Sequence, residues 1–474
     1  MKSLLVCLLA LGLGGCAAVP PAHPLDARAE AQALAAQRLN EPGLAAAEAR
    51  FGLASDANAP WTPDRITVAA WYFNPGLAQA RATATRTEAD AALAAQRANP
   101  ILKLSPEKVF SGLTGSSPWA VGVALLLPLL HPGEAAARHA IAAADTQAAR
   151  DQLRNAVWQT RAQAVAALRG LLLARRAQAL SETAAHANDA LLTAVQQRVK
   201  AGAADRGALL AAQLDAQRAS SDLVTRRAQR IAAAQALAAA VGVPAAALKR
   251  VKLAWPQLES PPAPTALPAA ALAQDAAWNR LDVVALLARY RTAEARLRLA
   301  AGSRYPGTSV APGYLYDQGQ RKFTFGIDVE LPLFHGAGAR IRAAAAARDE
   351  AAAAVRTKQA AILNQIDAAR ADYTARYEAW QRMASASESA RENAVRAIAS
   401  RKAGQTDRRG ELAAQVASAT AALAAQDALS AALKSLGRLE DAVQRPLWPA
   451  SKLTAGQRPT AVSLSGTVPA ERRR

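Results

Sequence analysis

The stretch Phe323-Thr-Phe-Gly-Ile-Asp-Val-Glu-Leu-Pro332 alternates apolar and polar residues, and it matches an earlier stretch, Trp119-Ala-Val-Gly-Val-Ala-Leu-Leu-Leu-Pro128. Side chains on a β-strand point alternately to opposite faces, so the alternation predicts a strand with one wholly apolar face. A tilted strand that crosses a membrane needs about 9–11 residues, which is the length available here. In the earlier stretch the polar face is weaker, with Ala120, Gly122 and Ala124 in the corresponding places.

The match between these two stretches is part of a longer internal duplication, with an offset close to 200 residues. The other matching pairs are Lys200-Ala-Gly202 with Lys402-Ala-Gly404, Val241-Gly242 with Leu436-Gly437, and the helical stretches Pro75 to Pro100 with Leu281 to Pro306. A long internal repeat is a signal about the whole fold. The chain is therefore expected to consist of two halves with the same order of elements.

Each predicted membrane strand has a partner strand just before it, which makes a β-hairpin at about 101–128 in the first half and at about 308–332 in the second. On the polar face of the second hairpin lie Asp328 and Glu330, which would face water. Pro106 and Pro312 cannot donate to a strand ladder, and we expect them to mark a bend where the strand leaves the helical region. A soluble hairpin packed on helices would show a similar pattern.

Two long stretches without proline follow the hairpins, from Pro132 to Pro244 and from Pro332 to Pro446. Because proline breaks helix interiors, and Ala, Arg, Gln, Glu and Leu fill both stretches, each predicts a long helical hairpin. The tips would lie at Gly202 and Gly404, and the arms Glu134–Ala201 and Ala339–Ala403 would each be roughly 100 Å long. Apolar residues recur along both arms at coiled-coil spacing. A soluble helical bundle shares that spacing.

The N-terminus carries the features of an export signal, with Lys2 followed by a short apolar run in residues 1–15. Leu13-Gly-Gly-Cys16 resembles a bacterial lipobox, which implies cleavage before Cys16 and its lipidation. Ala17 and Ala18 then favour outer-membrane sorting over retention at the inner membrane. An ordinary signal peptide with an incidental cysteine is the alternative.

Residues 16–70 are expected to form a lipid-anchored segment of short helices, and residues 71–243 and 280–445 the two repeats. Residues 244–279 would be a proline-rich linker at the equator of the molecule, and residues 446–474 a disordered tail. The formal net charge is +20, from 57 basic and 37 acidic residues. The basic residues are scattered beside acidic ones along helices, and the export signal separates the chain from nucleic acid, so no nucleic-acid partner is expected.

The sequence contains few features that are typical of an enzyme. The five histidines are isolated, without metal-ligand spacing: His23, His131, His139, His186 and His335. No phosphate-binding loop or nucleophile elbow occurs. We therefore predict no catalytic residues, no metal site and no cofactor, and the energy for any transport must come from another protein.

The order helix, β-hairpin, long helical hairpin, found twice behind a lipobox, resembles the TolC family of outer-membrane efflux proteins over roughly residues 65–445. The resemblance is carried by the helix openings Asn74-Pro-Gly-Leu77 and Arg280-Leu-Asp-Val283, the strand ends Leu127-Pro-Leu-Leu130 and Leu331-Pro-Leu-Phe334, and the Ala-Gly tips. The family usually has Arg-Pro-Asp where this chain has Arg280-Leu281-Asp282. The Asn-Pro opening and the short extracellular turn are closer to the heavy-metal (CzcC- and CusC-like) branch.

The resemblance implies a mainly α-helical protein with transmembrane β-strands. Three copies would build one twelve-stranded β-barrel, continuous with a periplasmic α-helical barrel. It also implies a passive outer-membrane conduit for drugs or metal ions, anchored by lipid and extending into the periplasm. Its partners would be a periplasmic adaptor and an inner-membrane pump, with the resistance-nodulation-division (RND) type expected. Asp328 and Glu330 would then face the barrel lumen.

In the family, the hairpin tips form the periplasmic entrance and meet the adaptor. The residues of this chain that fall there are Gly202, Asp205, Arg206, Gly404, Asp407, Arg408, Arg409 and Glu411. The arginines beside these carboxylates are candidates for salt bridges between protomers that hold the entrance shut, although helix capping and solvated charge would also explain them. Two other kinds of protein remain as alternatives. One is a periplasmic adaptor lipoprotein, and the other is a lipid-anchored coiled coil without a pore.

Overall fold

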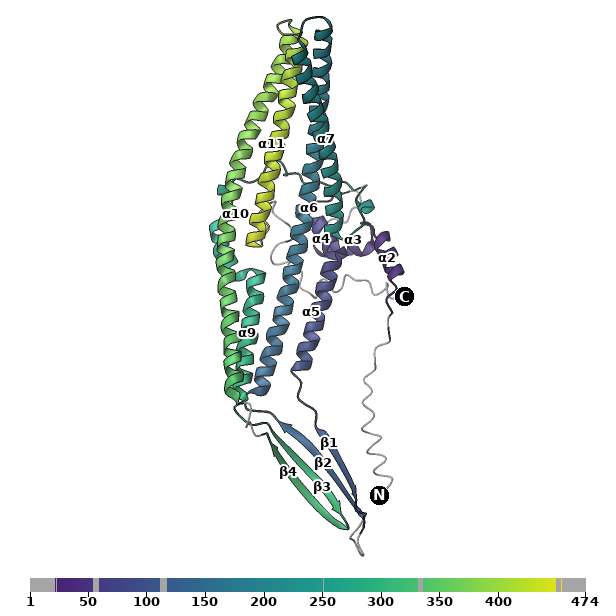
Figure 1. The fold of residues 1–474 in the computed structure, drawn as a ribbon, viewed down its shortest axis with the longest axis vertical. Helices are drawn as coiled ribbons and strands as arrows, with labels where there is room; N and C mark the ends of the chain where they lie inside the picture. Colours follow the sequence, from purple (N-terminus) through teal and green to yellow (C-terminus); the bar gives the residue numbers. More distant parts are fainter. Residues whose placement is uncertain are drawn as a thin grey trace.

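The computed structural model describes residues 22, 24–53, 59–110, 117–249, 251–330, 336–448 and 453. Within these ranges the molecule is elongated, with long helices that reach a tip at one end and a four-stranded sheet at the other (Figure 1). The expected signal peptide, Cys16, His23 and His335 lie outside the described residues.

The two halves have the predicted order of elements. The first contains α5 (Pro75–Ala94), β1 (Ile101–Lys108), β2 (Trp119–Leu129), α6 (Glu134–Lys200) and α7 (Arg206–Val241). The second contains α9 (Leu281–Gly302), β3 (Thr308–Asp317), β4 (Gln320–Val329), α10 (Ala337–Lys402) and α11 (Arg408–Val443). The long arms α6 and α10 have 67 and 66 residues, and α7 and α11 have 36 residues each. The prediction of two unbroken arms of roughly 100 Å is therefore confirmed.

The remaining elements form a layer at mid-height around the long helices, in part beside α6 and α7 and in part against α10 (Figure 1). They are α2 (Ala27–Ala36), α3 (Pro42–Arg50), α4 (Pro63–Phe73), α8 (Ala269–Asn279) and the short 3₁₀ turns η1 (Ala245–Leu248) and η2 (Pro264–Ala266). The layer is tied together by a parallel bridge between Trp61 and Leu253. It is tied to α6 by Trp71, whose Nε1 donates to the Val157 carbonyl at 3.0 Å.

The core lies where this layer meets the long helices. The apolar series predicted along the arms are part of it, with Leu168, Ile362, Ile366 and Tyr373 almost fully buried. The Tyr373 hydroxyl donates to the Pro262 carbonyl at 2.5 Å, which satisfies the one polar atom of that side chain. Among the described helices, α11 alone is long and apolar enough to cross a membrane, but its leucines pack in this core.

In each half, the side chain that precedes the short helix donates a hydrogen bond to a backbone carbonyl near the end of the last helix. Asn74 precedes α5 and donates through Nδ2 to the Ala240 carbonyl near the end of α7, at 3.0 Å. Arg280 precedes α9 and donates through Nη1 to the Ala442 carbonyl near the end of α11, at 2.7 Å. The duplication therefore extends to individual hydrogen bonds, with amide and guanidinium in the same role.

The pairing of Gly242 with Gly437, expected from the sequence, is wrong. Gly242 ends α7 in the left-handed conformation, with φ of 89°, and the residue in that position after α11 is Gln444, with φ of 49°. Gly437 lies inside α11 instead. A side chain there would overlap the guanidinium of Arg169, so this glycine makes room for a buried arginine of α6.

The four strands form one antiparallel sheet in the order β1-β2-β3-β4. The turn between β3 and β4 consists of Gln318 and Gly319, both with positive φ (50° and 103°), as a two-residue hairpin turn requires. Hairpin boundaries agree with the prediction to within a few residues.

The expected bend at the two prolines is also wrong, because both lie inside strands. Pro106 is in β1, at an edge of the sheet, where the missing N–H is tolerated. Pro312 is in the central strand β3, and the β2–β3 pairing is interrupted there, between Ala124–Gly313 and Leu127–Val310. The interruption follows from the missing donor of Pro312, while β3 and β4 remain paired throughout.

The chain stays packed beyond the expected start of the tail at residue 446. The buried carboxylate of Glu440 accepts hydrogen bonds from the backbone N–H groups of Leu447 and Trp448, at 2.7 and 2.9 Å. The Trp448 ring stacks on Trp255 of the equatorial layer, with centroids 5.7 Å apart. Residues 449–452 and 454–474 lie outside the described part of the chain.

Candidate functional site

The sheet has two chemically different faces. Directly paired residues share a face, so the register assigns every strand residue to one side. One face is apolar and consists largely of Leu102, Leu104, Trp119, Val121, Val123, Leu125, Leu127, Leu129, Val310, Tyr314, Phe323, Phe325, Ile327 and Val329. Most of these side chains are exposed, and Phe323 is 77% accessible. A soluble hairpin packed on helices would bury this face, so that alternative does not fit the structure.

The opposite face carries small and charged residues, among them Asp328, which the sequence had placed there. The Ser309 hydroxyl donates to Asp328 Oδ2 at 3.4 Å across the β3–β4 pair. Glu330 follows β4 directly, and strand alternation puts it on the same face. Nearer the far end of the sheet, Lys322 and Asp317 form an ion pair with Nζ and Oδ2 2.7 Å apart.

The helical tips at the other end of the molecule have the predicted geometry. Gly202 and Gly404 follow α6 and α10 with φ of 69° and 74°, as glycines that end helices do. Asp205 and Asp407 then cap α7 and α11, accepting from the backbone N–H of Ala208 at 2.6 Å and of Gly410 at 2.7 Å. The two tips are therefore near copies in backbone structure.

Their charges differ. Asp407 of the second tip forms an ion pair with Arg198 of α6, which joins the two hairpins. Glu411 is buried and is held by two arginines of its own hairpin, Arg401 at 3.0 Å and Arg408 at 2.9 Å. In the first tip, no ion pair involves Asp205 or Arg206 within the described residues.

These contacts shift the acidity of both carboxyl groups. The hydrogen bond from the Gly410 backbone, together with Arg198, lowers the pKa of Asp407. Burial raises the pKa of Glu411, but the hydrogen bonds from Arg408 and Arg401 outweigh it, so the net direction is downward. Both groups are therefore ionised at neutral pH, and the cluster is held together by charge.

Of the tip residues predicted from sequence, the structure brings together Asp407, Arg408 and Glu411. Arg409 makes no ion pair within the described part of the chain. Sequence reasoning missed Arg198 and Arg401, which are two of the three arginines in the cluster. Both lie in the last turn of a long helix, where a cation complements the helix dipole, and that position was the available signal.

A second polar cluster, not predicted, lies at mid-height where α9 begins and α11 ends. Arg280 binds Asp282 through both oxygens, at 3.1 and 2.8 Å, and Lys358 of α10 binds Asp282 at 2.8 Å. Burial raises the pKa of Asp282, and these two cations bring it below its ordinary value. The cluster lines an open groove of about 690 Å³ that also contains Asn155, Gln163 and Asp441, among others. The charges named here all belong to the second half, and Gln444 links that half to the first by donating through Nε2 to Asn155 Oδ1 at 3.1 Å.

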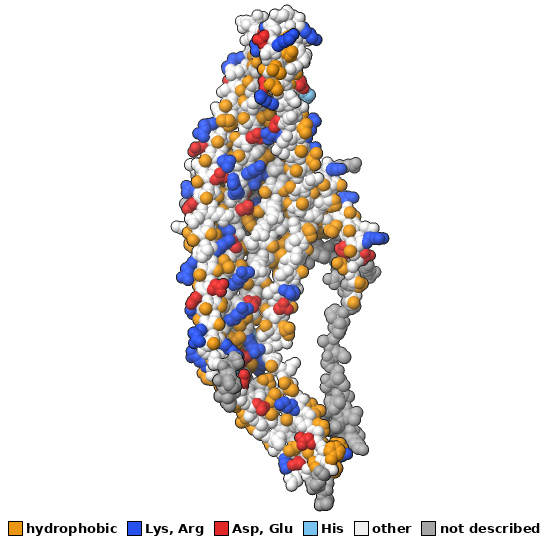
Figure 2. Space-filling view, viewed as in Figure 1, with side chains coloured by type: hydrophobic (Ala, Val, Ile, Leu, Met, Phe, Trp, Pro, Cys, Tyr) orange, Lys and Arg blue, Asp and Glu red, His pale blue; other side chains and the backbone are white. Residues whose placement is uncertain are grey.

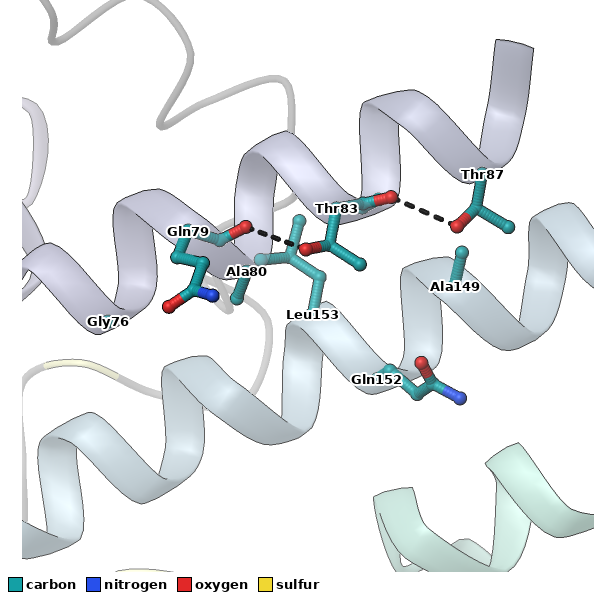
Figure 3. A pocket seen from close by; sticks show the side chains of 9 residues that line it. Gly76, Gln79, Ala80, Thr83, Thr87, Ala149, Gln152 and Leu153 are labelled. Atoms are coloured by element: carbon teal, nitrogen blue, oxygen red, sulfur yellow. Dashed lines mark hydrogen bonds between the residues drawn. The ribbon is translucent and has the colours of Figure 1, made fainter. Parts of the chain in front are cut away.

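A smaller groove of about 230 Å³ lies between α5 and α6 (Figure 3). Two hydroxyl groups in its lining are engaged within α5: the Thr83 hydroxyl donates to the Gln79 carbonyl and the Thr87 hydroxyl to the Thr83 carbonyl, each at 3.0 Å. The side-chain amides of Gln79 and Gln152 also line the groove. The rest of the lining is mostly small, with Gly76, Ala80 and Ala149. This groove therefore has the character of a helix-packing surface.

Within the described residues, no group of three or more His, Cys, Asp or Glu side chains is arranged to hold a metal ion. On the face of the molecule that Figure 2 shows, Lys and Arg side chains are scattered along the helices next to Asp and Glu. They form no continuous basic patch on that face, which agrees with the scattered basic residues in the sequence.

Comparison with known proteins gives a consistent result for the fold. No family model and no curated protein matches the sequence. Among solved structures, the chain is similar to the CmeC outer membrane channel of Campylobacter jejuni, with a TM-score of 0.67, 13% identity, and coverage of 87% of this chain and 90% of that one. It is similar to the outer membrane protein VceC of Vibrio cholerae, with a TM-score of 0.64, 18% identity, and coverage of 81% and 96%. A membrane protein of Pseudomonas aeruginosa is 21% identical, with a TM-score of 0.64 and coverage of 80% and 93%.

Proposed function

We propose that this chain, which has the fold of the TolC-family outer-membrane channels, forms the outer-membrane duct of a tripartite efflux system. Three copies would assemble, each giving four strands to a twelve-stranded β-barrel and its long helices to a periplasmic tube. Toxic solutes, either drugs or metal ions, would pass through it from a periplasmic adaptor and an inner-membrane pump of the RND type. The duct itself would be passive and would catalyse no reaction.

The observation that carries this proposal is the open sheet with an exposed apolar face. Within the described residues, β1 and β4 are both edge strands without a partner on one side. Lipid cannot satisfy the unpaired N–H and C=O groups of such edges, so a membrane sheet must close on itself. Four strands are too few to enclose a channel. Pairing β4 of each copy with β1 of the next closes twelve strands without a free edge.

The helices supply a second seam between copies. α7 and α10 lie at the two lateral edges of the helical wall (Figure 1). Helix α7 exposes Leu210, Val224 and Ile231, with accessibilities of 57%, 63% and 51%. These residues are separated by two heptads and then by one, which is the spacing of a helix that packs against another helix. In a closed tube, α10 of the second copy would pack against these residues of α7.

The tips would form the periplasmic entrance. We infer that the ion pair of Arg198 with Asp407 holds each protomer's two hairpins together, while Arg401, Arg408 and Glu411 stabilise the tip of the second hairpin. Arg206 and Arg409, which make no ion pair within the described residues, are then the candidates for contacts between protomers or with the adaptor. Asp328 and Glu330 would face the barrel lumen, and lipidated Cys16 would anchor the N-terminus to the outer membrane.

The two alternative classes fit the structure less well. A periplasmic adaptor would have one helical hairpin flanked by larger β domains, whereas the described part of this chain has two helical hairpins and one sheet. A coiled coil without a pore would not explain the exposed apolar face of the sheet.

The decisive experiment is single-channel recording of the purified protein in planar bilayers, with chemical crosslinking to count subunits. A crosslinked trimer with discrete conductance, larger or more frequently open after Asp407→Asn, is the expected result. A monomer that stays silent, also with the tip variant, would overturn the proposal and favour the adaptor.

A further inference from the structure

The apolar face of the sheet carries two charged residues among the four strands, and both are cations. They are Lys108, opposite Trp119 on β2, and Arg321, opposite Tyr316 on β3. The other face carries both signs, with Lys103, Glu107, Asp317, Lys322 and Asp328. Contact with water explains charges of both signs on the polar face, but it does not explain two cations on the apolar face.

Both cations lie at the end of the sheet that is far from the helices. Lys108 is the last residue of β1, and Arg321 is the second residue of β4. At the near end of the same face the residues are Thr308, Leu129 and Val329, which are uncharged. The charge on this face is thus confined to one end.

Aromatic rings accompany these cations. Lys108 Nζ lies 5.1 Å from the centroid of Phe110 and 5.5 Å from that of Trp119. Within the described residues neither Lys108 nor Arg321 forms an ion pair with a carboxylate, in contrast to Lys322, which is bound to Asp317 at 2.7 Å on the other face. Both are therefore available to an anion from outside the chain.

Membrane physics gives such a position a meaning. On the lipid-facing side of a barrel, Lys or Arg strongly destabilises the protein at the membrane midplane but hardly at all near the interface. Trp and Tyr also concentrate at that level, and long basic side chains extend their charge toward the head groups. Because the two cations are confined to one end of the sheet, they favour contact with anionic head groups in the leaflet at that end.

We propose that Lys108 and Arg321 bind the phosphate of lipid head groups in the leaflet that surrounds the distal end of the sheet. The proposal rests on the proposed trimeric barrel. In that barrel β4 of one subunit adjoins β1 of the next, so Arg321 and the partner subunit's Lys108 lie on neighbouring strands, about 5 Å apart between strand axes. Each of the three seams then forms one basic site that a single subunit cannot complete.

The test is native mass spectrometry of the detergent-purified trimer titrated with diphosphoryl lipid A. The wild type is expected to retain up to three lipid molecules. The Lys108→Gln/Arg321→Gln variant is expected to lose about 25-fold in apparent affinity, from about fivefold for each cation. Lys322→Gln is the matched control, because this lysine is next to Arg321 but on the other face. The Lys108→Arg/Arg321→Lys variant keeps both charges and should keep the binding.

Unchanged lipid binding in the double glutamine variant, or an equal loss in Lys322→Gln, would overturn the proposal. Measuring the conductance of the wild type and of each variant distinguishes failure of the lipid site from failure of the proposed channel function. A trimer that conducts normally without binding lipid would refute only the lipid site. Absence of a trimer and of conductance in the wild type would refute the barrel, and the lipid site with it.

Discussion

Arg198, near the end of α6, forms an ion pair with Asp407, the residue that caps α11, and so joins the first helical hairpin to the second. The two residues are 209 positions apart in sequence. If the tips form the entrance of a duct, this contact controls how far the two hairpins of one protomer can separate.

Replacing Asp407 by Asn should therefore loosen the tip without unfolding it. Asparagine caps helices as well as aspartate does, so the hydrogen bond to Gly410 is retained while the charge is lost. Because a solvent-exposed ion pair is weak, its loss should change the ratio of open to closed channels by no more than about fivefold for each protomer. Single-channel open probability measures this directly.

The first tip supplies the control for that variant. Asp205→Asn keeps the equivalent cap on α7, and Asp205 makes no ion pair within the described residues. Its open probability should equal that of the wild type. Equal effects of the two substitutions would show that capping, and not the link to Arg198, closes the tip.

The tip contacts should weaken in acid. Both Asp407 and Glu411 have a pKa below the ordinary value in the folded protein, so the stabilisation they give is present above the unfolded-state pKa and is lost as pH falls through the folded-state pKa. The ordinary values are 3.8 and 4.5. Open probability should be constant from about pH 8 to pH 5 and rise only below about pH 4. A transition centred near pH 6.5 would point to a histidine instead.

The two faces of the sheet should respond differently to the same new charge. Phe325→Arg puts a cation on the apolar face, at a cost of about 2–4 kcal/mol if that face meets the centre of the lipid layer. Thr324→Arg puts the same cation on the polar face one residue away. We expect loss of membrane insertion and of the trimer for Phe325→Arg alone, measured by crosslinking after reconstitution. Similar trimer yields for both variants would exclude a lipid-facing role.

Gly242 should tolerate no side chain. A Cβ at this position would lie 2.7 Å from the Phe73 carbonyl oxygen and 2.8 Å from Asn74 Cα, and φ is 89°. Gly202→Ala has a similar φ of 69° but nothing within 4 Å, so it isolates the backbone strain, about 1 kcal/mol. Thermal unfolding should show a clearly larger loss for Gly242→Ala. Equal losses would mean that the junction of α4 and α5 with α7 can move aside.

The duplicated order of elements, the strand boundaries, the long arms and the tips could all be predicted from the sequence. These features depend on local rules, since alternation specifies a strand face and the absence of proline permits an uninterrupted helix. The faces of Asp328 and Glu330, and the caps Asp205 and Asp407, follow from the same rules.

Only the tertiary structure decided which distant groups meet. Arg198 and Asp407, or Arg169 and Gly437, come together because α6 packs beside α11, and no local pattern reports which helices are neighbours. The same is true of Pro312, whose effect depends on its place in a central strand of the sheet. The sequence thus determined the elements and their order, whereas packing determined the partners of each charge, because a charge is paired by distance in space and not along the chain.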